Sequence, residues 1–129
     1  MPSIKATHHH IKAHNRDLVL KMIIDNRVTS RADIARETKL TRATVSEVVT
    51  GLMAEGLVEE IGVGSSTGGK PSILLSLVSD ARYLIGVYIS EEKFIGAIVN
   101  LRGEIKATVE IPVKSKDSDL ALRSVTTIL

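Results

Sequence analysis

Between residues 30 and 57 the apolar positions follow a helical period in two short runs, each preceded by a residue that can cap a helix. Ser30 precedes the first run, and Asp33 three residues later gives an acidic variant of the capping box, so a helix is expected to start near Arg31. Thr41 precedes the second run. Its apolar residues have the spacing of one buried stripe: Val45, Val48, Val49, Leu52 and Met53. The pattern predicts two capped helices in tandem.

The second of these helices is expected to carry a polar outer face. Away from the apolar stripe lie mainly short or hydrogen-bonding side chains: Arg42, Thr44, Ser46, Glu47 and Thr50. Side chains of this kind fit against base edges and phosphates in the major groove of DNA. The alternative is a solvated helix of a small bundle, because helix pairs are common and groove binding is only one of their uses. The helical period alone leaves both open.

An extended pattern follows Gly56, which can end the second helix, and predicts a β-hairpin. Its strands are residues 57–63 and 72–77, and the second strand has three apolar residues on one face: Ile73, Leu75 and Leu77. Residues 64–71 (GSSTGGKP) form the loop between them. A helix pair followed at once by such a hairpin is typical of a winged helix, whose wing contacts the DNA backbone or minor groove. The expected wing residues are Ser65, Ser66, Thr67, Gly68, Gly69 and Lys70.

The same glycine-rich loop has a competing interpretation as a cradle for a nucleotide phosphate. The GxxxxGK[ST] motif requires Ser or Thr after the lysine and then a helix. Here Pro71 follows Lys70, and a strand comes next. This order favours a wing.

A third helix, capped by Asn15 and running from Arg16 to about Asp25, is expected to cover the helix pair with its apolar residues. Residues 1–14 are predicted to form a flexible arm, which contains four histidines: His8, His9, His10 and His14. Adjacent histidines can bind a metal ion. However, only alternate ones share a face, the chain has no Cys, and a mobile terminus is poorly preorganised, so a solvated arm or a tag is favoured.

Composition narrows the class of protein. The 129 residues suffice for one domain or two small ones, and no apolar run approaches the roughly 18 residues of a membrane span. Without Cys there are no disulfides or thiolate metal sites, and no secretory signal precedes the first helix, so a soluble, cytoplasmic protein is expected. One Phe, two Tyr and no Trp disfavour a base-stacking surface for single strands or RNA.

Charge is distributed unevenly along the chain. Residues 1–46 carry nine Lys or Arg against four Asp or Glu, a net charge of +5. Residues 47–80 carry one against five, a net charge of −4. The positive part is the one that would meet DNA phosphates.

Beyond Ser79 the pattern predicts a second domain that starts with a three-stranded meander. Its strands are residues 84–90, 94–101 and 104–113, with a turn at 100–103. Asp119 can cap a final helix with an apolar face: Leu120, Ala121, Leu122, Val125, Ile128 and Leu129. A meander and one helix leave much apolar surface uncovered, so a partner chain or further polypeptide is expected to cover it.

Three segments carry a resemblance to a known family: NRDLVL (15–20), SRADIARETKLTRATVSEVVTGLMAEGLVEE (30–60) and the wing STGGKP followed by ILLSL (66–77). They resemble the amino-terminal module of transcriptional repressors of the ROK family (repressor, open reading frame, kinase). IGVYISEEKFIGAIVNLRGEI (85–105) is similar to the opening strands of that family's actin-like, ribonuclease H-like sugar-kinase domain. The resemblance implies an α+β fold, with a winged helix-turn-helix over 15–79 and a fragment of the sugar-sensing domain over 80–129.

The resemblance also implies homo-oligomers, such as homodimers, that bind operators of sugar-catabolism genes and respond to a sugar or sugar phosphate in the second domain. Family kinases hold ATP phosphates with Asp-x-Gly-x-Thr, whereas this chain has Tyr88, Ile89, Ser90, Glu91 and Glu92 at that place. The acidic metal partner and the glycine are missing, and Glu91 and Glu92 would repel phosphate, so no catalysis is expected. The family's zinc motif and sugar-contacting residues would lie beyond Leu129, so no cofactor or metal site is expected here.

The expected mechanism is sequence-specific binding of double-stranded DNA by a dimer. Residues 41–50, Ala43 included, would enter the major groove, with Arg42 as the foremost contact; its alternative is a surface arginine with no specific role. Ser30 and Arg31 would hold the backbone. Gly69, Lys70 and Pro71 resemble the core of an AT-hook and favour A·T-rich flanks. Two other functions stay open: a ROK-type sugar kinase with an added DNA-binding domain, and a winged-helix module that binds proteins.

Overall fold

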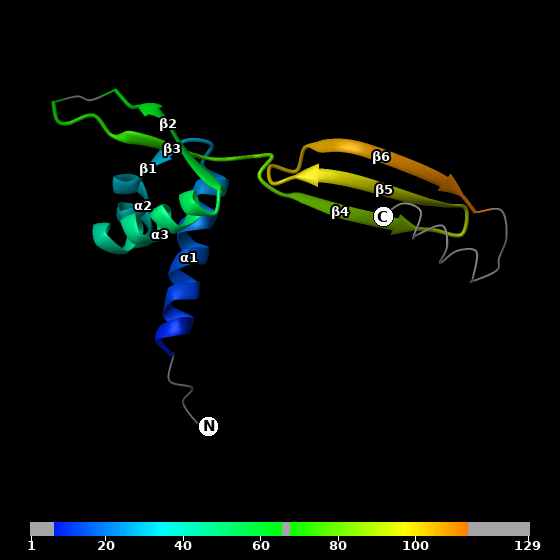
Figure 1. Ribbon diagram of the computed structural model, residues 1–129, viewed down its shortest axis with the longest axis horizontal. Coiled ribbons are helices and arrows are strands. Elements are labelled where there is room, and N and C mark those ends of the chain that lie inside the picture. The colour runs from blue at the N-terminus through cyan, green and yellow to red at the C-terminus, as the bar shows by residue number, and fades with distance from the viewer. Residues whose placement is uncertain (1–6, 66–67, 114–129) are drawn as a thin grey trace. The chain divides into compact units, whose positions relative to one another are not determined.

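The computed structural model describes residues 7–65 and 68–113. The chain divides into two compact units at the bond between Val78 and Ser79. Val78 still belongs to the first unit, since its N–H donates to the Leu57 carbonyl (2.9 Å), and the Ser79 carbonyl already accepts from Leu101 N–H in the second (3.0 Å). Within the described residues, helices and a small sheet form the first unit and a separate sheet forms the second (Figure 1). This is the predicted α+β class.

The first helix, α1 (His8–Asp25), begins earlier than predicted. Thr7 is its N-cap and accepts from His10 N–H (3.4 Å), so Asn15 is not the cap, and the prediction of an arm over residues 1–14 is wrong from His8 onward. The missed turns are exposed and have no apolar stripe, which is why the helical period did not reveal them. The buried positions of α1, Val19 and Ile23, come later in the helix.

The helix pair has the predicted caps. In α2 (Arg31–Thr38) Ser30 accepts from Asp33 N–H, and in α3 (Arg42–Ala54) Thr41 accepts from Thr44 N–H (3.1 Å). At the end of α3, Gly56 adopts φ 72°, its N–H donates to the Met53 carbonyl (2.9 Å), and Leu57 N–H donates to the Leu52 carbonyl (3.0 Å). These two bonds form a Schellman motif, so Gly56 ends the helix as expected.

A three-stranded antiparallel sheet with the order β1-β3-β2 completes the first unit. β2 (Val58–Val63) and β3 (Ile73–Leu77) are the predicted hairpin, while β1 (Thr29–Ser30) was not predicted. Of the three apolar residues expected on one face of β3, Leu75 and Leu77 are buried but Ile73, near the loop, is 45% exposed. The core lies where helices and sheet meet: Val19, Ile23, Ile34, Val45, Val49, Leu52, Val58, Leu75 and Leu77.

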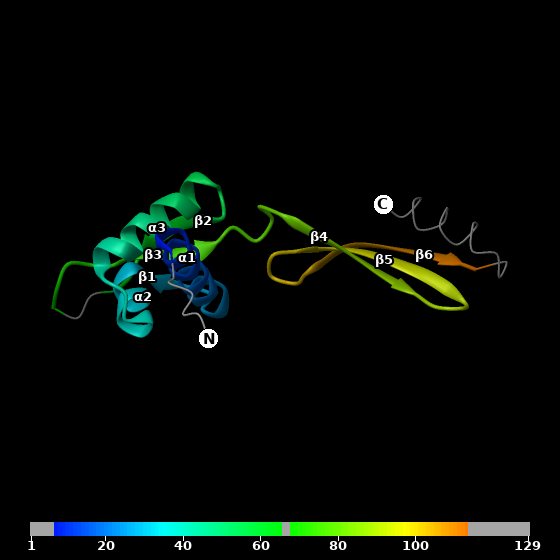
Figure 2. The same cartoon turned by 90° about the horizontal axis from the view of Figure 1, so that it is seen from below.

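The second unit is the predicted meander, with β4 (Tyr83–Ile89), β5 (Lys93–Asn100) and β6 (Ile105–Pro112) antiparallel in sequence order. Figure 2 shows this sheet as a twisted layer. Asn100 is 1% exposed and organises the β5–β6 turn, donating to Asp80 Oδ1 and Glu104 Oε2 (both 2.8 Å) and accepting from the N–H groups of Arg102 and Glu104 (both 3.0 Å). The Asn100 bond, with Lys106 beside it, holds the pKa of Asp80 below its ordinary value.

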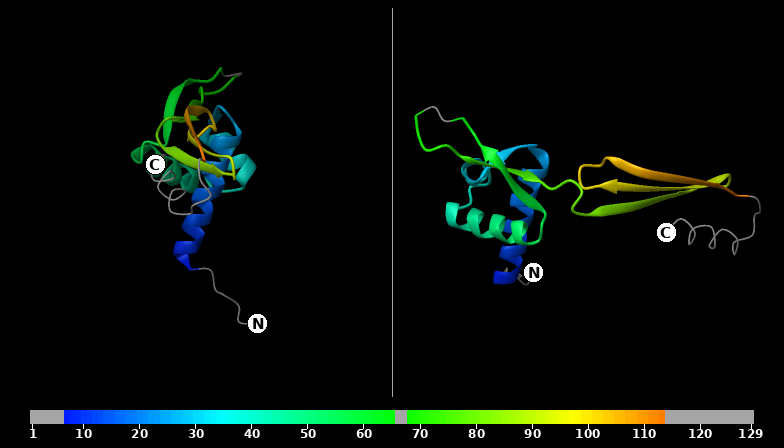
Figure 3. Two further views of the ribbon diagram at one scale, coloured as in Figure 1. Left: turned by 90° about the vertical axis from the view of Figure 1, so that its right-hand side faces the viewer. Right: turned by 45° about the horizontal axis from the view of Figure 1, so that its top comes forward.

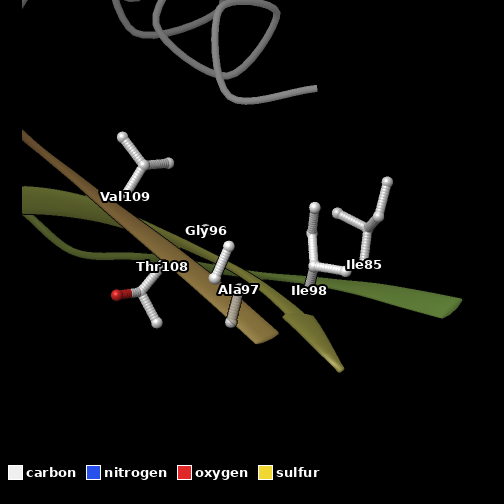
Figure 4. Close-up of a pocket in the computed structure, with 7 residues that line it drawn as sticks. Ile85, Gly96, Ala97, Ile98, Thr108 and Val109 are labelled. Atoms are coloured by element: carbon white, nitrogen blue, oxygen red, sulfur yellow. The ribbon is translucent and has the colours of Figure 1, made fainter. Parts of the chain in front are cut away.

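One face of the meander is apolar. Ile85, Ile98 and Val109 point to the same side around Gly96, whereas Thr108 points to the opposite side (Figure 4). These three residues are 55%, 39% and 42% exposed, respectively. The predicted final helix from Asp119 lies outside the described residues. Among the residues that are described, no helix is long and apolar enough to cross a membrane.

Candidate nucleic-acid interface

The turn between α2 and α3 is fixed by backbone conformation and by Thr38. Lys39 adopts a left-handed conformation (φ 62°) that ends α2. Thr38 Oγ1 donates to the Ile34 carbonyl (2.6 Å) and accepts from Leu40 N–H (3.4 Å). Leu40 is half-buried under the turn. This local geometry sets the angle at which α3 leaves α2, as in a helix-turn-helix.

The outward face of α3 presents most of the predicted recognition residues to solvent. Thr41, Arg42, Ala43, Glu47 and Thr50 are exposed, whereas Thr44 and Ser46 are half-buried. The opposite face is anchored in the core by side chains with no exposed surface: Val45, Val49 and Leu52. The face is therefore held rigidly, which is what hydrogen bonding to base edges requires.

A cleft of about 300 Å³ lies beside this face, and three segments of the first unit line it. It is lined by the start of α2, by Arg42 and Ser46 of α3, and by residues 70–73 at the base of the hairpin. Arg31, Arg42 and Lys70 bring three cationic side chains to it from separate segments. Arg42 has no ion pair within the described part of the chain. A concave, cationic surface of this kind suits a phosphate backbone.

Arg31 has a second role that the sequence did not indicate. Its Nη2 lies 3.0 Å from Glu60 Oε1 of β2 and 3.8 Å from the Met53 sulfur of α3. The side chains of Arg31 and Glu60 are 28% and 39% exposed, so the pair stays open to solvent. Arg31 thus ties α2 to the sheet while it lines the cleft.

The other predicted backbone contact, Ser30, is 3% exposed. Its hydroxyl is already bonded to the N–H and carboxylate of Asp33. Ser30 is also the second residue of β1, where it pairs with Leu74. Ser30 therefore positions α2; it also lines the cleft beside Arg31, and its contact with the DNA backbone stays a prediction.

The predicted wing projects from the helices of the first unit (Figure 3, right). Its base is closed by Gly64 N–H donating to the Ser72 carbonyl (2.8 Å). Ser65, Gly69 and Lys70 are exposed, and Gly68 adopts φ 94°, a conformation that L side chains rarely adopt. Ser66 and Thr67 lie outside the described residues.

Two ion pairs link α1, a helix that was not predicted to belong to the site, to α3 and to its C-cap residue Glu55. Lys12 Nζ lies 3.4 Å from Glu47 Oε1. Arg16 forms a bidentate pair with Glu55, both N–O distances being 2.9 Å. Lys12 was assigned to a flexible arm, and no local pattern connects it with Glu47, 35 residues away.

No group of His, Cys, Asp or Glu in the described ranges is arranged to hold a metal ion, the histidines at the start of α1 included. The segment that stands where the family's kinases have their phosphate-binding motif forms a tight turn between β4 and β5. Ser90 Oγ accepts from Lys93 N–H (3.1 Å) and donates to the Lys93 carbonyl (2.9 Å), and Glu91 and Glu92 are exposed.

Comparison with known proteins places these features in a family. The chain is 39% identical over 95 residues to the xylose repressor of Bacillus spizizenii, covering 74% of this chain and 25% of the relative. It is 32% identical over 117 residues to the xylose repressor of Staphylococcus xylosus, covering 89% and 29%. The DNA-binding transcriptional dual regulator NagC of Escherichia coli is 27% identical over 108 residues, covering 82% and 26%. No family model matches the chain.

The fold has a counterpart among solved structures. The crystal structure of a ROK family transcriptional regulator, a homologue of the E. coli MLC protein, superposes with a TM-score of 0.70 at 22% identity, over 90% of this chain and 30% of that one. The chain belongs to the ROK family. It spans about a quarter of the length of the curated relatives it matches. Its two units correspond to the winged helix-turn-helix of a ROK regulator and the start of the actin-like domain.

Proposed function

We propose that this ROK-family chain is the DNA-binding part of a sugar-responsive transcriptional repressor that acts in the cytoplasm. The observation that carries the proposal is the cleft in which Arg31, Arg42 and Lys70 converge beside the outward face of α3. The names of the relatives, xylose repressors among them, support the same function.

In this mechanism the outward face of α3 enters the major groove, and Arg42 bonds a guanine or a phosphate. The residues at the start of α2 lie along the backbone, and the wing from Ser65 to Lys70 enters the minor groove of A·T-rich flanks. The full protein binds as a homodimer or larger homo-oligomer, and a sugar or sugar phosphate in the complete second domain changes its affinity for DNA. No cofactor or metal is needed by this part of the protein.

In this proposal the protein does not transfer phosphate. The turn at Ser90 carries two exposed carboxylates where the family's kinases hold ATP. A coupled assay of ATP consumption with xylose and several hexoses is expected to show no turnover. Sugar-dependent turnover by the full-length protein would support a kinase instead.

Selection of bound sequences from random double-stranded DNA tests the main proposal. We expect the chain to enrich one motif, with two half-sites related by a two-fold axis when the oligomer forms. Retention of random DNA at low salt without enrichment would favour a winged helix that binds proteins.

A further inference from the structure

Glu47 stands near the middle of the outward face of α3, and among the described residues its ion-pair partner comes from α1. Its carboxylate lies 3.4 Å from Lys12 Nζ, and the two side chains are 72% and 61% exposed. One helical turn further along α1, the bidentate pair of Arg16 and Glu55 joins α1 to the C-cap residue of α3. The two pairs link α1 to α3, which are in contact within the first unit.

The outward face of α3 is bordered on both sides. The cationic cleft reaches it at Arg42 and Ser46, and a groove of about 240 Å³ between α1 and α3 reaches it at Thr44, Glu47 and Val48. At 3.6 residues per turn, the exposed residues on the ridge opposite the core are Ala43, Glu47 and Thr50. Glu47 is thus the charged side chain of the ridge that points most directly away from the core.

A carboxylate at this place has both a cost and a use. Phosphates on either side of a major groove would repel a bare carboxylate. Paired with Lys12, it adds no net charge to the surface. Its use is specificity, because Glu and Asp accept a hydrogen bond from the N4 amino group of cytosine.

We infer that Lys12 is a positioning residue, which holds the Glu47 carboxylate where it accepts a hydrogen bond from a cytosine amino group in the major groove. The inference rests on the proposed function, since it concerns the same interface. Glu47 touches the base, and Lys12 acts through Glu47 by restricting its rotamers and cancelling its charge. α1 thereby becomes part of the specificity apparatus of the domain.

The test is a base-by-base affinity profile. Affinity for the selected DNA and for every single-base-pair variant of it is measured at fixed salt for the wild-type chain and for Glu47→Ala, Glu47→Gln, Lys12→Met and Lys21→Met. Lys21 is the matched control, because it is also an exposed lysine of α1 in an ion pair, and its partner Asp25 lies on the same helix.

The wild type is expected to prefer C·G at one position of a half-site by about tenfold. Glu47→Ala abolishes that preference and no other, and Glu47→Gln moves it toward adenine, the usual partner of Gln. Lys12→Met lowers the preference at the same position several-fold, and adding it to Glu47→Ala changes the profile no further. Lys21→Met leaves the profile unchanged.

Two results overturn the inference. One is a Glu47→Ala profile identical to that of the wild type. The other is a uniform loss across all sequences with a shallower salt dependence in Lys12→Met, which would make Lys12 a phosphate contact. Thermal unfolding of each variant, followed by circular dichroism, separates these outcomes from a loss of folding. A wild type that selects no sequence contradicts the proposed function itself, whereas one that selects a sequence without a Glu47-dependent position contradicts this inference alone.

Discussion

The Ser30 hydroxyl and the Asp33 carboxylate bond each other at the start of α2. Ser30 Oγ accepts from Asp33 N–H (3.2 Å) and donates to Asp33 Oδ2 (2.7 Å). Arg36 donates to the other carboxylate oxygen, Oδ1 (2.7 Å). Because Ser30 also pairs with β3, this bond fixes α2 to the sheet and so places Arg31 at the edge of the cationic cleft.

Replacing this cap should weaken the first unit measurably. Ser30→Ala is expected to lower the free energy of unfolding by about 1 kcal/mol, the usual cost of losing a serine cap. Thr7→Ala is the matched control, since that cap lies at an exposed helix end with a longer bond of 3.4 Å, and its loss should cost less. Urea unfolding followed at a helix wavelength measures both. Equal losses would contradict the role given to Ser30.

Acid should remove part of the same stabilisation. The Ser30 hydrogen bond lowers the pKa of Asp33 below its ordinary value of 3.8; partial burial opposes this, and Arg36 lowers the pKa further through a hydrogen bond and its charge. A carboxylate whose pKa is lower in the folded state stabilises the fold above its unfolded pKa and loses that contribution as the pH falls through the folded value. Unfolding free energies measured from pH 6 to pH 2.5 should therefore fall more steeply below about pH 4 in the wild type than in Asp33→Asn.

Asp17→Asn serves as the comparison for this titration, because Asp17 is an exposed carboxylate of α1. A parallel decline of Asp33→Asn and the wild type at low pH would show that Asp33 does not contribute to the acid sensitivity.

Features set by neighbouring residues could be predicted from the sequence. The caps at Ser30 and Thr41 involve bonds across three residues, and the strands of the meander alternate with a period of two. Gly56 likewise ends α3 within its own segment. In each case the pattern and the bonds that realise it lie in the same short stretch of chain.

Features set by distant partners could not be predicted from the sequence. β1 has only two residues, and it is a strand because Thr29 meets Leu75 and Ser30 meets Leu74 of β3. The first turns of α1 have no apolar stripe, and Lys12 finds Glu47 only once the helices are packed. For the same reason the ion pair of Arg31 could not be predicted, because its partner Glu60 lies on β2.

Arg42 should be needed for sequence-specific binding. Its side chain is exposed on α3 and lines the cationic cleft, so Arg42→Ala is expected to weaken binding to the selected DNA by about 1–3 kcal/mol, the scale of a base-contacting residue. A gel-shift titration against selected and scrambled DNA measures the loss. Unchanged affinity for the selected DNA would remove Arg42 from the interface.

Glu60 should compete with DNA for Arg31. Its carboxylate lies 3.0 Å from the Arg31 guanidinium in a partly exposed pair. Glu60→Gln removes a negative charge from the edge of the cleft and is expected to tighten DNA binding at low salt by up to about 1 kcal/mol, the scale of such pairs. The gain should vanish in the double variant with Arg31→Ala. A gain that persists there would mean that Glu60 acts on DNA without Arg31.

Lys70 should contribute charge rather than sequence preference. It is exposed at the end of the wing loop and lines the cationic cleft, where it can meet a phosphate. Each phosphate neutralised by a lysine adds about 0.9 to the slope of log affinity against log salt, so Lys70→Ala should make that slope shallower by about this amount and weaken all sequences alike. Fluorescence anisotropy with labelled DNA at four salt concentrations measures the slope. Lys21→Ala is the control and should leave the slope unchanged, because Lys21 is paired with Asp25 in the carboxyl-terminal half of α1. An unchanged slope in Lys70→Ala would place Lys70 off the DNA.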